Sequence, residues 1–198
     1  MLSFWWIRHA PVIGNNNSCY GNNEVECDLS DKQSFQNLSN KLPSDAIVYT
    51  SELSRSIKTF RTVEGYGLSY KYHYIDKRIS EQNLGDYTGM KYNELYKLTK
   101  KLGIYDKNWL MKASYSPPNG ESYNNLINRV KDFINEIIKK HKGGNIIIFS
   151  HGGPIRAAIS LAINYQFNKV IPIEIDNTTL TIINYNKDNN YKILKINS

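Results

Sequence analysis

The sequence predicts a three-layer α/β/α sandwich with a mostly parallel central sheet. Two runs of four apolar residues, 4–7 and 146–149, are typical of strands that are buried on both faces. Short apolar runs alternate with helical patterns along the chain, as they do where crossover helices join parallel strands. The length of 198 residues fits one domain, 1–198, with a surface excursion expected at about 90–120.

The beginning of the chain is predicted to form a strand, a long loop and a helix. The strand covers about residues 3–7, and a polar loop rich in Asn and Gly follows over 9–29. A loop of this length inside a compact domain usually has a function. Ser30 is expected to cap the helix, which continues to about Leu42 and ends before Pro43.

A second strand and helix carry an arginine to the carboxyl edge of the predicted sheet. The strand covers 46–50, and Ser51 is expected to cap the helix that follows. Arg55 lies in the first turns of this helix, close to the end of the strand. The apolar side of the helix repeats at helical spacing: Leu53, Ile57, Phe60 and Val63. A weak alternation over 70–74 indicates a third strand at an edge, and residues 75–89 are predicted to be irregular.

The second half of the chain contains the clearest helix. A helix over about 92–102 precedes the excursion, whose end is rich in Pro and Gly. The clearest helix begins at Ser122 or a neighbour, and Gly143-Gly144 is expected to stop it. Its apolar stripe consists of Leu126, Val130, Phe133, Ile134, Ile137 and Ile138. Residues 145–149 then form the fourth strand.

The last part of the chain is predicted to contain one more helix and a hairpin. Residues 152–154, Gly-Gly-Pro, open the helix, because proline suits a first helical turn. Two antiparallel strands, 179–184 and 191–196, are joined by a turn at 187–190.

Charge and composition favour a small anionic ligand. The net charge of +7 and the pI near 9.2 attract anions. Because no dense basic run is interleaved with aromatic residues, no nucleic acid is expected, whereas a small phosphorylated substrate fits. No apolar run approaches the roughly 20 residues of a membrane span, and no signal-peptide pattern precedes the first strand, so we expect a cytoplasmic protein with no membrane partner. Cys19 and Cys27 are expected to be reduced, and they have no zinc-ligand spacing.

Five residues are expected to meet at one edge of the sheet. His9 and His151 each follow one of the two buried apolar runs, so both lie where α/β sheets bind ligands. Arg8, Arg55 and Glu81 are predicted at the same edge. Two arginines and two histidines there would trap a dianion, because a guanidinium group matches phosphate oxygens bidentately.

This set of residues can transfer a phosphoryl group without a metal or a cofactor. One histidine can attack phosphorus and form a phosphohistidine, while the other holds phosphoryl oxygens. The free N–H groups of Gly152 and Gly153 add the positive end of a helix. Glu81 is the candidate acid that protonates the leaving alkoxide. The other two histidines, His73 and His141, are expected to be exposed to solvent.

Five segments resemble, in order, the signature motifs of the histidine phosphatase superfamily, which includes the cofactor-dependent phosphoglycerate mutases. Residues 8–10, Arg-His-Ala, are similar to its Arg-His-Gly signature. Residues 50–59 resemble its S-x-L-x-R-A-x-x-T helix start, and residues 81–89 its E-x-x-x-G-x-x-x-G loop. Residues 120–129 resemble its G-E-S-x6-R helix start, and residues 150–153 its second histidine motif.

The resemblance implies a phosphoglycerate mutase-like fold and a role for each matched residue. His9 would be the phosphorylated nucleophile, and Glu81 would be the proton donor. Arg8, Arg55 and His151 would form the phosphate pocket.

The sequence departs from the superfamily's motifs at two positions. Ala10 stands where glycine is usual, and Ser56 stands where alanine is usual. Asn15, six positions after the nucleophile, matches an asparagine that is frequent in the family. Tyr20 and Gly21 of the long loop would line the side of the site that holds the leaving group. The predicted substrate-binding residues are Asn15, Tyr20, Gly21 and Gly152.

Three functions stay open at this point. The short segment between Gly89 and Gly120 favours a metal-independent phosphatase, because similar mutases usually carry a longer insertion there. Residues 10–12 and 19–21 look like the α-ribazole phosphatase subgroup, which acts in cobalamin nucleotide-loop assembly, so α-ribazole 5'-phosphate is the leading substrate. The alternatives are phosphoglycerate mutase-type phosphoryl transfer and a non-catalytic anion-binding relic. The expected partner is a small-molecule phosphate ester, and a homodimer is left open.

Overall fold

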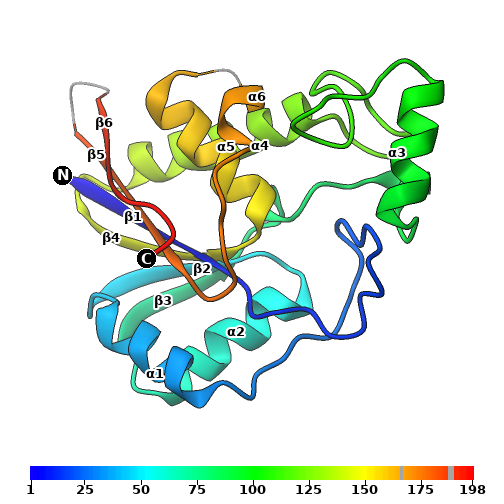
Figure 1. Ribbon diagram of the computed structural model, residues 1–198. Helices are drawn as coiled ribbons and strands as arrows, with labels where there is room; N and C mark the ends of the chain where they lie inside the picture. Colours follow the sequence, from blue (N-terminus) through cyan, green and yellow to red (C-terminus); the bar gives the residue numbers. More distant parts are fainter. Residues whose placement is uncertain (166, 187–189) are drawn as a thin grey trace.

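The computed structural model describes residues 1–165, 167–186 and 190–198, and its centre is a six-stranded sheet (Figure 1). The strands are β1 (Leu2–Arg8), β2 (Ala46–Thr50), β3 (Tyr70–Ile75), β4 (Gly144–Ser150), β5 (Leu180–Tyr185) and β6 (Tyr191–Lys195). Their order is β3-β2-β4-β1-β5-β6. β1 to β4 are mutually parallel, whereas β5 pairs antiparallel with β1 and with β6. The predicted mostly parallel α/β sheet is confirmed.

Helices cover both faces of this sheet and give the three predicted layers (Figure 1). One face carries α1 (Lys32–Lys41) and α2 (Ser54–Gly65), and the other carries α4 (Tyr123–Lys140) and α5 (Gly152–Ile163). Alternate strand residues point to opposite faces. Trp6 and Ile148 therefore pack with α4 and α5, whereas Ile7 and Phe149 pack with α1 and α2. Both four-residue apolar runs are buried on two sides, as predicted.

A third, smaller core lies away from the sheet, beneath α3 (Tyr92–Lys101). The 3-10 turns η1 (Lys77–Ile79) and η2 (Gly85–Tyr87) precede α3, and the four-residue helix α6 (Phe167–Val170) follows α5. The buried members of this core are Cys19, Leu84, Tyr87, Leu95 and Met111. They join the long loop after β1 to the loop after β3 and to the excursion. No helix in the described parts of the chain is both long enough and apolar enough to cross a membrane.

The first two helices begin differently from the sequence prediction. The Asp31 carboxylate caps α1 by accepting a hydrogen bond from the Ser34 N–H (3.0 Å). The prediction that Ser30 caps this helix is therefore wrong. Leu53 precedes α2 without a side-chain cap, so the prediction of Ser51 is also wrong. The Ser51 N–H still bonds to a β4 carbonyl oxygen (3.3 Å), which keeps the chain extended beyond β2.

The later elements lie close to their predicted positions. Ser122 caps α4 as predicted, but the helix ends before the glycine pair because His141 is already extended. The terminal strands pair antiparallel, as predicted. Of the turn predicted at 187–190, residues 187–189 lie outside the described residues. The short helix α6 has no counterpart among the predicted elements.

Candidate active site

The two strand-end histidines lie next to each other at the carboxyl edge of the sheet. β1 pairs with β4 so that Arg8 is opposite Ser150, and the His9 N–H donates to the Ser150 carbonyl oxygen (3.0 Å). The rings of His9 and His151 have centroids 5.0 Å apart, and both residues are fully buried. The prediction that both histidines lie where buried strands end, at one edge of the sheet, is confirmed, and the two strands are neighbours.

His9 keeps one ring nitrogen free. Its Nδ1 lies 2.7 Å from the Ala10 carbonyl oxygen, which can only accept, so Nδ1 carries the proton and Nε2 the lone pair. Nε2 is buried without a hydrogen-bond partner among the described residues. Asn177 donates to the His9 carbonyl (2.7 Å) and the Ala10 N–H donates to Thr59 (2.8 Å), which fixes the backbone. Burial, with a smaller effect of the Arg55 charge, lowers the pKa of His9 to about 3, so the ring is neutral at pH 7.

His151 is held by a serine of the neighbouring strand end. Its Nε2 lies 2.8 Å from Ser51 Oγ, and its Nδ1 is buried with no partner in the described part of the chain. Burial, followed by the neighbouring His9, keeps the pKa of His151 well below its usual value. Helix α5 begins at the next residue, Gly152, so the first N–H groups of a helix lie beside this ring.

Two guanidinium groups are fixed by backbone carbonyl groups. Arg55 is fully buried and donates from Nη1 to Asn23 (2.7 Å) and from Nη2 to Gly21 (2.8 Å). Arg8 donates from Nη1 to the carbonyl oxygen of Ile175 (2.6 Å). In both residues the Nε–H group is buried and unpartnered among the described residues. The long loop after β1 therefore orients Arg55, and each arginine keeps a donor for an anion.

The Glu81 carboxylate lies at the amino end of α5. Its Oε2 accepts a hydrogen bond from the Gly153 N–H (3.3 Å), and its Oε1 accepts one from the Gln82 N–H (3.0 Å). Burial lowers the pKa of Arg55, and Glu81 is the charge that offsets this effect most. An acid, a cation and a helix end thus share one small region.

An ion pair from α4 holds the loop that carries Glu81. Arg129 donates from Nε and Nη2 to the two carboxylate oxygens of Glu121 (3.0 and 2.8 Å). Arg129 also donates to the carbonyl oxygens of Glu81 (3.1 Å) and Arg78 (2.6 Å). Glu121 in turn accepts a hydrogen bond from the Asn83 N–H (3.0 Å). The predicted G-E-S-x6-R motif therefore positions the loop over residues 81–89 (the acidic loop).

A cavity of about 220 Å³ opens onto these groups. It is lined by Arg8, Cys19, Tyr20, Gly21, Glu81, Gln82, Leu84, Tyr92, Trp109, Leu110, Gly152, Gly153 and Arg156. Three of the predicted substrate-binding residues, Tyr20, Gly21 and Gly152, are in this lining, whereas Asn15 is not. The two histidines and Arg55 are fully buried and are not in this lining.

Arg156 is a cation of this cavity that the sequence patterns did not single out. It lies one turn into α5, and its Nε donates to the Ile173 carbonyl oxygen (2.9 Å). A Cβ atom on Gly152 would lie 2.9 Å from Arg156 Nη1 and 3.8 Å from Arg8 Nε, so both guanidinium groups flank this glycine. The signal that finds Arg156 is its spacing, because residues i and i+4 of a helix share a face.

The five motifs that resemble one family thus come together at one edge of the sheet. A model of the histidine phosphatase superfamily (branch 1) matches residues 4–198. The chain belongs to the histidine phosphatase superfamily. Within this superfamily the predicted phosphoglycerate mutase-like fold is confirmed.

Several named proteins are similar to this superfamily member. Phosphoserine phosphatase 1 of Hydrogenobacter thermophilus is 26% identical over 203 residues, covering 100% of this chain and 92% of that protein. A bifunctional protein of Mycobacterium tuberculosis is 24% identical over 123 residues, 62% of this chain, and the chain spans about a third (33%) of that protein's length. The solved alpha-ribazole phosphatase from Shigella flexneri has a TM-score of 0.79 at 23% identity, covering 100% of this chain and 96% of the other. This last likeness establishes the fold alone.

The structure accommodates both departures from the superfamily's motifs. Ala10 is fully buried and its backbone is not left-handed, so a methyl group in place of the usual glycine causes no strain. Ser56, in place of alanine, donates a hydrogen bond to a β4 carbonyl oxygen (2.6 Å) and ties α2 to the sheet.

Three polar side chains have different surroundings from those predicted. His73 and His141 are half-buried, so the expectation of solvent exposure is wrong. His73 belongs to the edge strand β3, and its Nε2 lies 3.0 Å from Thr50 Oγ1 at the end of β2. Ser51, predicted to cap a helix, is instead the hydrogen-bond partner of His151. A tertiary contact of this kind leaves no local signal in the sequence.

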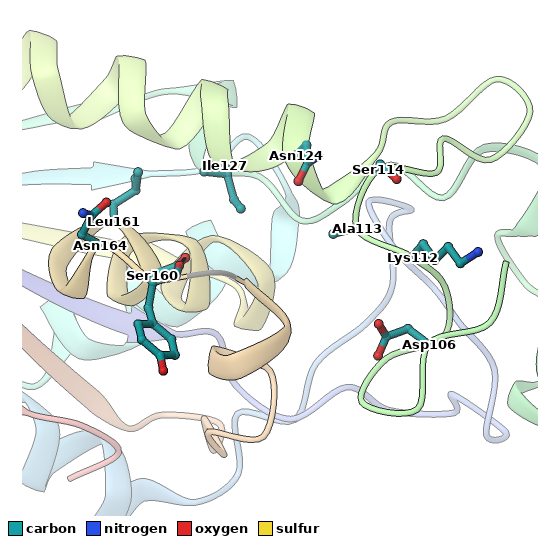
Figure 2. Close-up of a pocket in the computed structure, with 10 residues that line it drawn as sticks. Asp106, Lys112, Ala113, Ser114, Asn124, Ile127, Ser160, Leu161 and Asn164 are labelled. Carbon is teal, nitrogen blue, oxygen red and sulfur yellow. Dashed lines mark hydrogen bonds between the residues drawn. The ribbon is translucent and has the colours of Figure 1, made fainter.

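A larger cavity of about 610 Å³ lies elsewhere, between the end of α5, the start of α4 and the excursion (Figure 2). Its lining consists of Asp106, Lys112, Ala113, Ser114, Asn124, Ile127, Ser160, Leu161, Asn164 and Tyr165. This lining includes none of the candidate catalytic residues, and Ser160 Oγ is already paired with a carbonyl oxygen (2.5 Å). Within the described ranges, no three His, Cys, Asp or Glu side chains form a group that could hold a metal ion.

The two buried histidines should make folding stability depend on pH. Folding lowers the pKa of His9 from 6.5 to about 3 and lowers that of His151 as well. Between pH 6.5 and 3 the unfolded chain binds more protons than the folded one. The free energy of unfolding is therefore expected to decrease as pH falls through this window, by up to about 1.4 kcal/mol per pH unit for His9, and His151 acts in the same direction. Urea unfolding at pH 7 and pH 5 measures this decrease, and an equally large decrease in His9→Gln would contradict the assignment to His9.

Proposed function

We propose that this protein is a metal-independent phosphomonoester hydrolase that works through a phosphohistidine on a small phosphorylated metabolite. The observation that carries the proposal is the neutral, unpartnered Nε2 of His9, buried beside Arg55 and His151. Fixed guanidinium groups attract the phosphoryl dianion without protonating the nucleophile, so attraction and nucleophilicity do not compete.

In the proposed first step, His9 Nε2 attacks phosphorus while Arg8, Arg55 and His151 hold the phosphoryl oxygens. The P–N bond forms as the bond to the leaving oxygen breaks, and Glu81 donates its proton to that oxygen. The imidazole ring becomes positively charged, and the carbonyl oxygen that accepts from its Nδ1–H stabilises this charge. In the second step, water attacks phosphorus and gives a proton to the Glu81 carboxylate. The P–N bond then breaks, which returns the electron pair to Nε2.

The burial of His9 adds a requirement to this mechanism. Its Nε2 is inaccessible, so neighbouring side chains have to move before a phosphoryl group can reach it. Arg8, Glu81 and Arg156 line the cavity of about 220 Å³, and the unpartnered Nε–H of Arg8 can donate to a bound phosphate while its Nη1 stays bonded to Ile175. His151 can donate from Nδ1 to a phosphoryl oxygen when its Nε2 accepts from the Ser51 hydroxyl.

The leading substrate is α-ribazole 5'-phosphate, which would place the protein in cobalamin nucleotide-loop assembly. Residues 10–12 and 19–21 support this choice through their resemblance to the α-ribazole phosphatase subgroup. The similarity in fold to a solved alpha-ribazole phosphatase agrees with it. The relative named phosphoserine phosphatase makes phosphoserine the main competing substrate.

A phosphate-release assay on the purified protein tests the proposal. We expect hydrolysis of 4-nitrophenyl phosphate in the presence of EDTA, because the cations of the site are side chains. Release from α-ribazole phosphate, phosphoserine, the phosphoglycerates, nucleotides and sugar phosphates then ranks the substrates. Activity that EDTA abolishes would refute metal independence. Exchange between 2- and 3-phosphoglycerate without phosphate release would establish the mutase alternative, and no activity on any ester would favour the anion-binding relic.

A further inference from the structure

The cavity has one charged end and one uncharged end. The residues Arg8, Glu81 and Arg156 lie with Gly152 and Gly153 at the amino end of α5, which is the phosphate end. The rest of the lining comes from the long loop, the acidic loop, α3 and the excursion: Cys19, Tyr20, Gly21, Gln82, Leu84, Tyr92, Trp109 and Leu110. This second set contains no Asp, Glu, Lys, Arg or His. Burial also raises the pKa of the Cys19 thiol to about 12, so that group is uncharged as well.

Gln82 contributes a fixed hydrogen-bond acceptor to the uncharged end. The side chain is 3% exposed, and its Nε2 donates to the Glu121 carbonyl oxygen (3.0 Å). A carbonyl oxygen only accepts, so this contact fixes which side of the amide is the oxygen. The Oε1 atom is buried without a partner among the described residues. Because Arg129 holds Glu121 at both carboxylate oxygens, this amide rests on a rigid support.

Trp109, in the excursion, contributes a hydrogen-bond donor to the lining of the same cavity. Its Nε1–H is buried and has no acceptor within the described residues. The backbone around it is fixed, because the Trp109 N–H donates to Asp106 (3.2 Å) and the Lys112 N–H donates to Ile104 (2.8 Å). Native proteins pair nearly all buried polar groups, so an acceptor left over on one lining residue and a donor left over on another indicate contacts made to a ligand.

We propose that Gln82 and Trp109 are the specificity-determining residues of this site, and that they select an uncharged, partly apolar leaving group carrying a hydroxyl or N–H group. Gln82 Oε1 and Trp109 Nε1 are both buried, as His9 Nε2 is, so a ligand has to move the side chains that cover them. Gln82 Oε1 then accepts a hydrogen bond from the hydroxyl or N–H group of the ligand, and Trp109 Nε1–H donates one to it or to a neighbouring acceptor. Leu84, Leu110 and the aromatic rings cover the apolar face of the leaving group. The inference rests on the proposed phosphatase function and disfavours leaving groups with a carboxylate, which Gln82 Oε1 would repel.

Matched phenyl phosphates test this inference. The 3- and 4-hydroxyphenyl phosphates, assayed separately, offer a hydroxyl group that phenyl phosphate lacks, and 3-carboxyphenyl phosphate offers a charge. We expect the wild-type kcat/KM to be at least about tenfold higher for one hydroxyphenyl isomer than for phenyl phosphate. The carboxyphenyl ester is expected to be the poorest substrate.

Two variants then assign the preference to residues. Gln82→Met removes the acceptor at similar volume, and Trp109→Phe removes the donor while keeping an aromatic ring. Each is expected to bring the hydroxyphenyl-to-phenyl ratio of kcat/KM to within about threefold of one. Gln33→Met, on the exposed side of α1, is the matched control and should keep the wild-type ratio. Inhibition by inorganic phosphate, which occupies only the charged end, reports whether each variant is folded.

The outcomes separate this inference from the function on which it rests. A wild-type ratio near one, a preference for the carboxyphenyl ester, or an unchanged ratio in both variants would overturn the inference while hydrolysis continues. If one variant fails to fold, the ratio in the other still decides. Failure of the wild-type protein to hydrolyse any of the four esters would refute the proposed function itself, and the inference with it.

Discussion

Replacing His9 with alanine is expected to lower kcat/KM for every phosphomonoester by at least about 10⁴-fold. The variant keeps Arg8, Arg55 and the helix end, so phosphate can still bind, but no lone pair remains to attack phosphorus. Steady-state hydrolysis of 4-nitrophenyl phosphate measures the loss. Radiolabelled substrate, quenched in alkaline denaturant, should label the wild-type protein and leave the His9→Ala variant unlabelled.

The matched control is His141→Ala. His141 follows α4 at the amino edge of the sheet, at the opposite end of β4 from His151. It is half-buried and is not in the lining of the cavity that contains Arg8 and Glu81, so its removal should leave hydrolysis and labelling unchanged. Unchanged hydrolysis in His9→Ala, or labelling that persists there, would contradict the assignment of the nucleophile.

The fold could be predicted from the sequence where a pattern repeats over several residues. The apolar runs of β1 and β4 show that both strands are buried on two faces, and the structure places them side by side. The stripe of α4 is equally clear, and Ser122 caps it as predicted. The prediction of a helix cap fails where two neighbouring polar residues can both cap, as Ser30 and Asp31 can before α1. The prediction that Ser51 caps α2 is wrong because its hydroxyl group bonds to His151, 100 positions away.

The candidate site could be predicted where the candidate catalytic residues follow strand ends or repeat a family motif. His9, His151, Arg55 and Glu81 satisfy that condition, and the structure brings them to one edge of the sheet. Arg156 is marked only by its spacing of four residues from Gly152, so the sequence motifs do not single it out. Gln82 and Trp109 are joined only through the fold, because the acidic loop and the excursion meet across the cavity. Single residues without a spacing pattern become visible as site residues only in three dimensions.

Replacing Glu81 with glutamine should separate proton donation from the other steps. Glutamine keeps an oxygen that can accept the Gly153 N–H, but it has no acidic proton for the leaving oxygen. An alkoxide needs that proton far more than 4-nitrophenolate does. We therefore expect kcat/KM to fall about 10²- to 10⁴-fold for an alkyl phosphate and much less for 4-nitrophenyl phosphate.

The same substitution should also make the phosphohistidine visible. Glu81 is the proposed base for the attacking water, so in Glu81→Gln the second step slows while 4-nitrophenolate still leaves in the first. Rapid-mixing kinetics should then show a burst close to one 4-nitrophenolate per site, followed by slow turnover. Glu64→Gln, on α2 beside Arg61, is the control and should show neither effect. An equal fall for both esters without a burst would mean that Glu81 holds the site together without moving a proton. In that case Glu81, and the Arg129 and Glu121 side chains that fix its loop, would contribute to substrate binding and not to proton transfer.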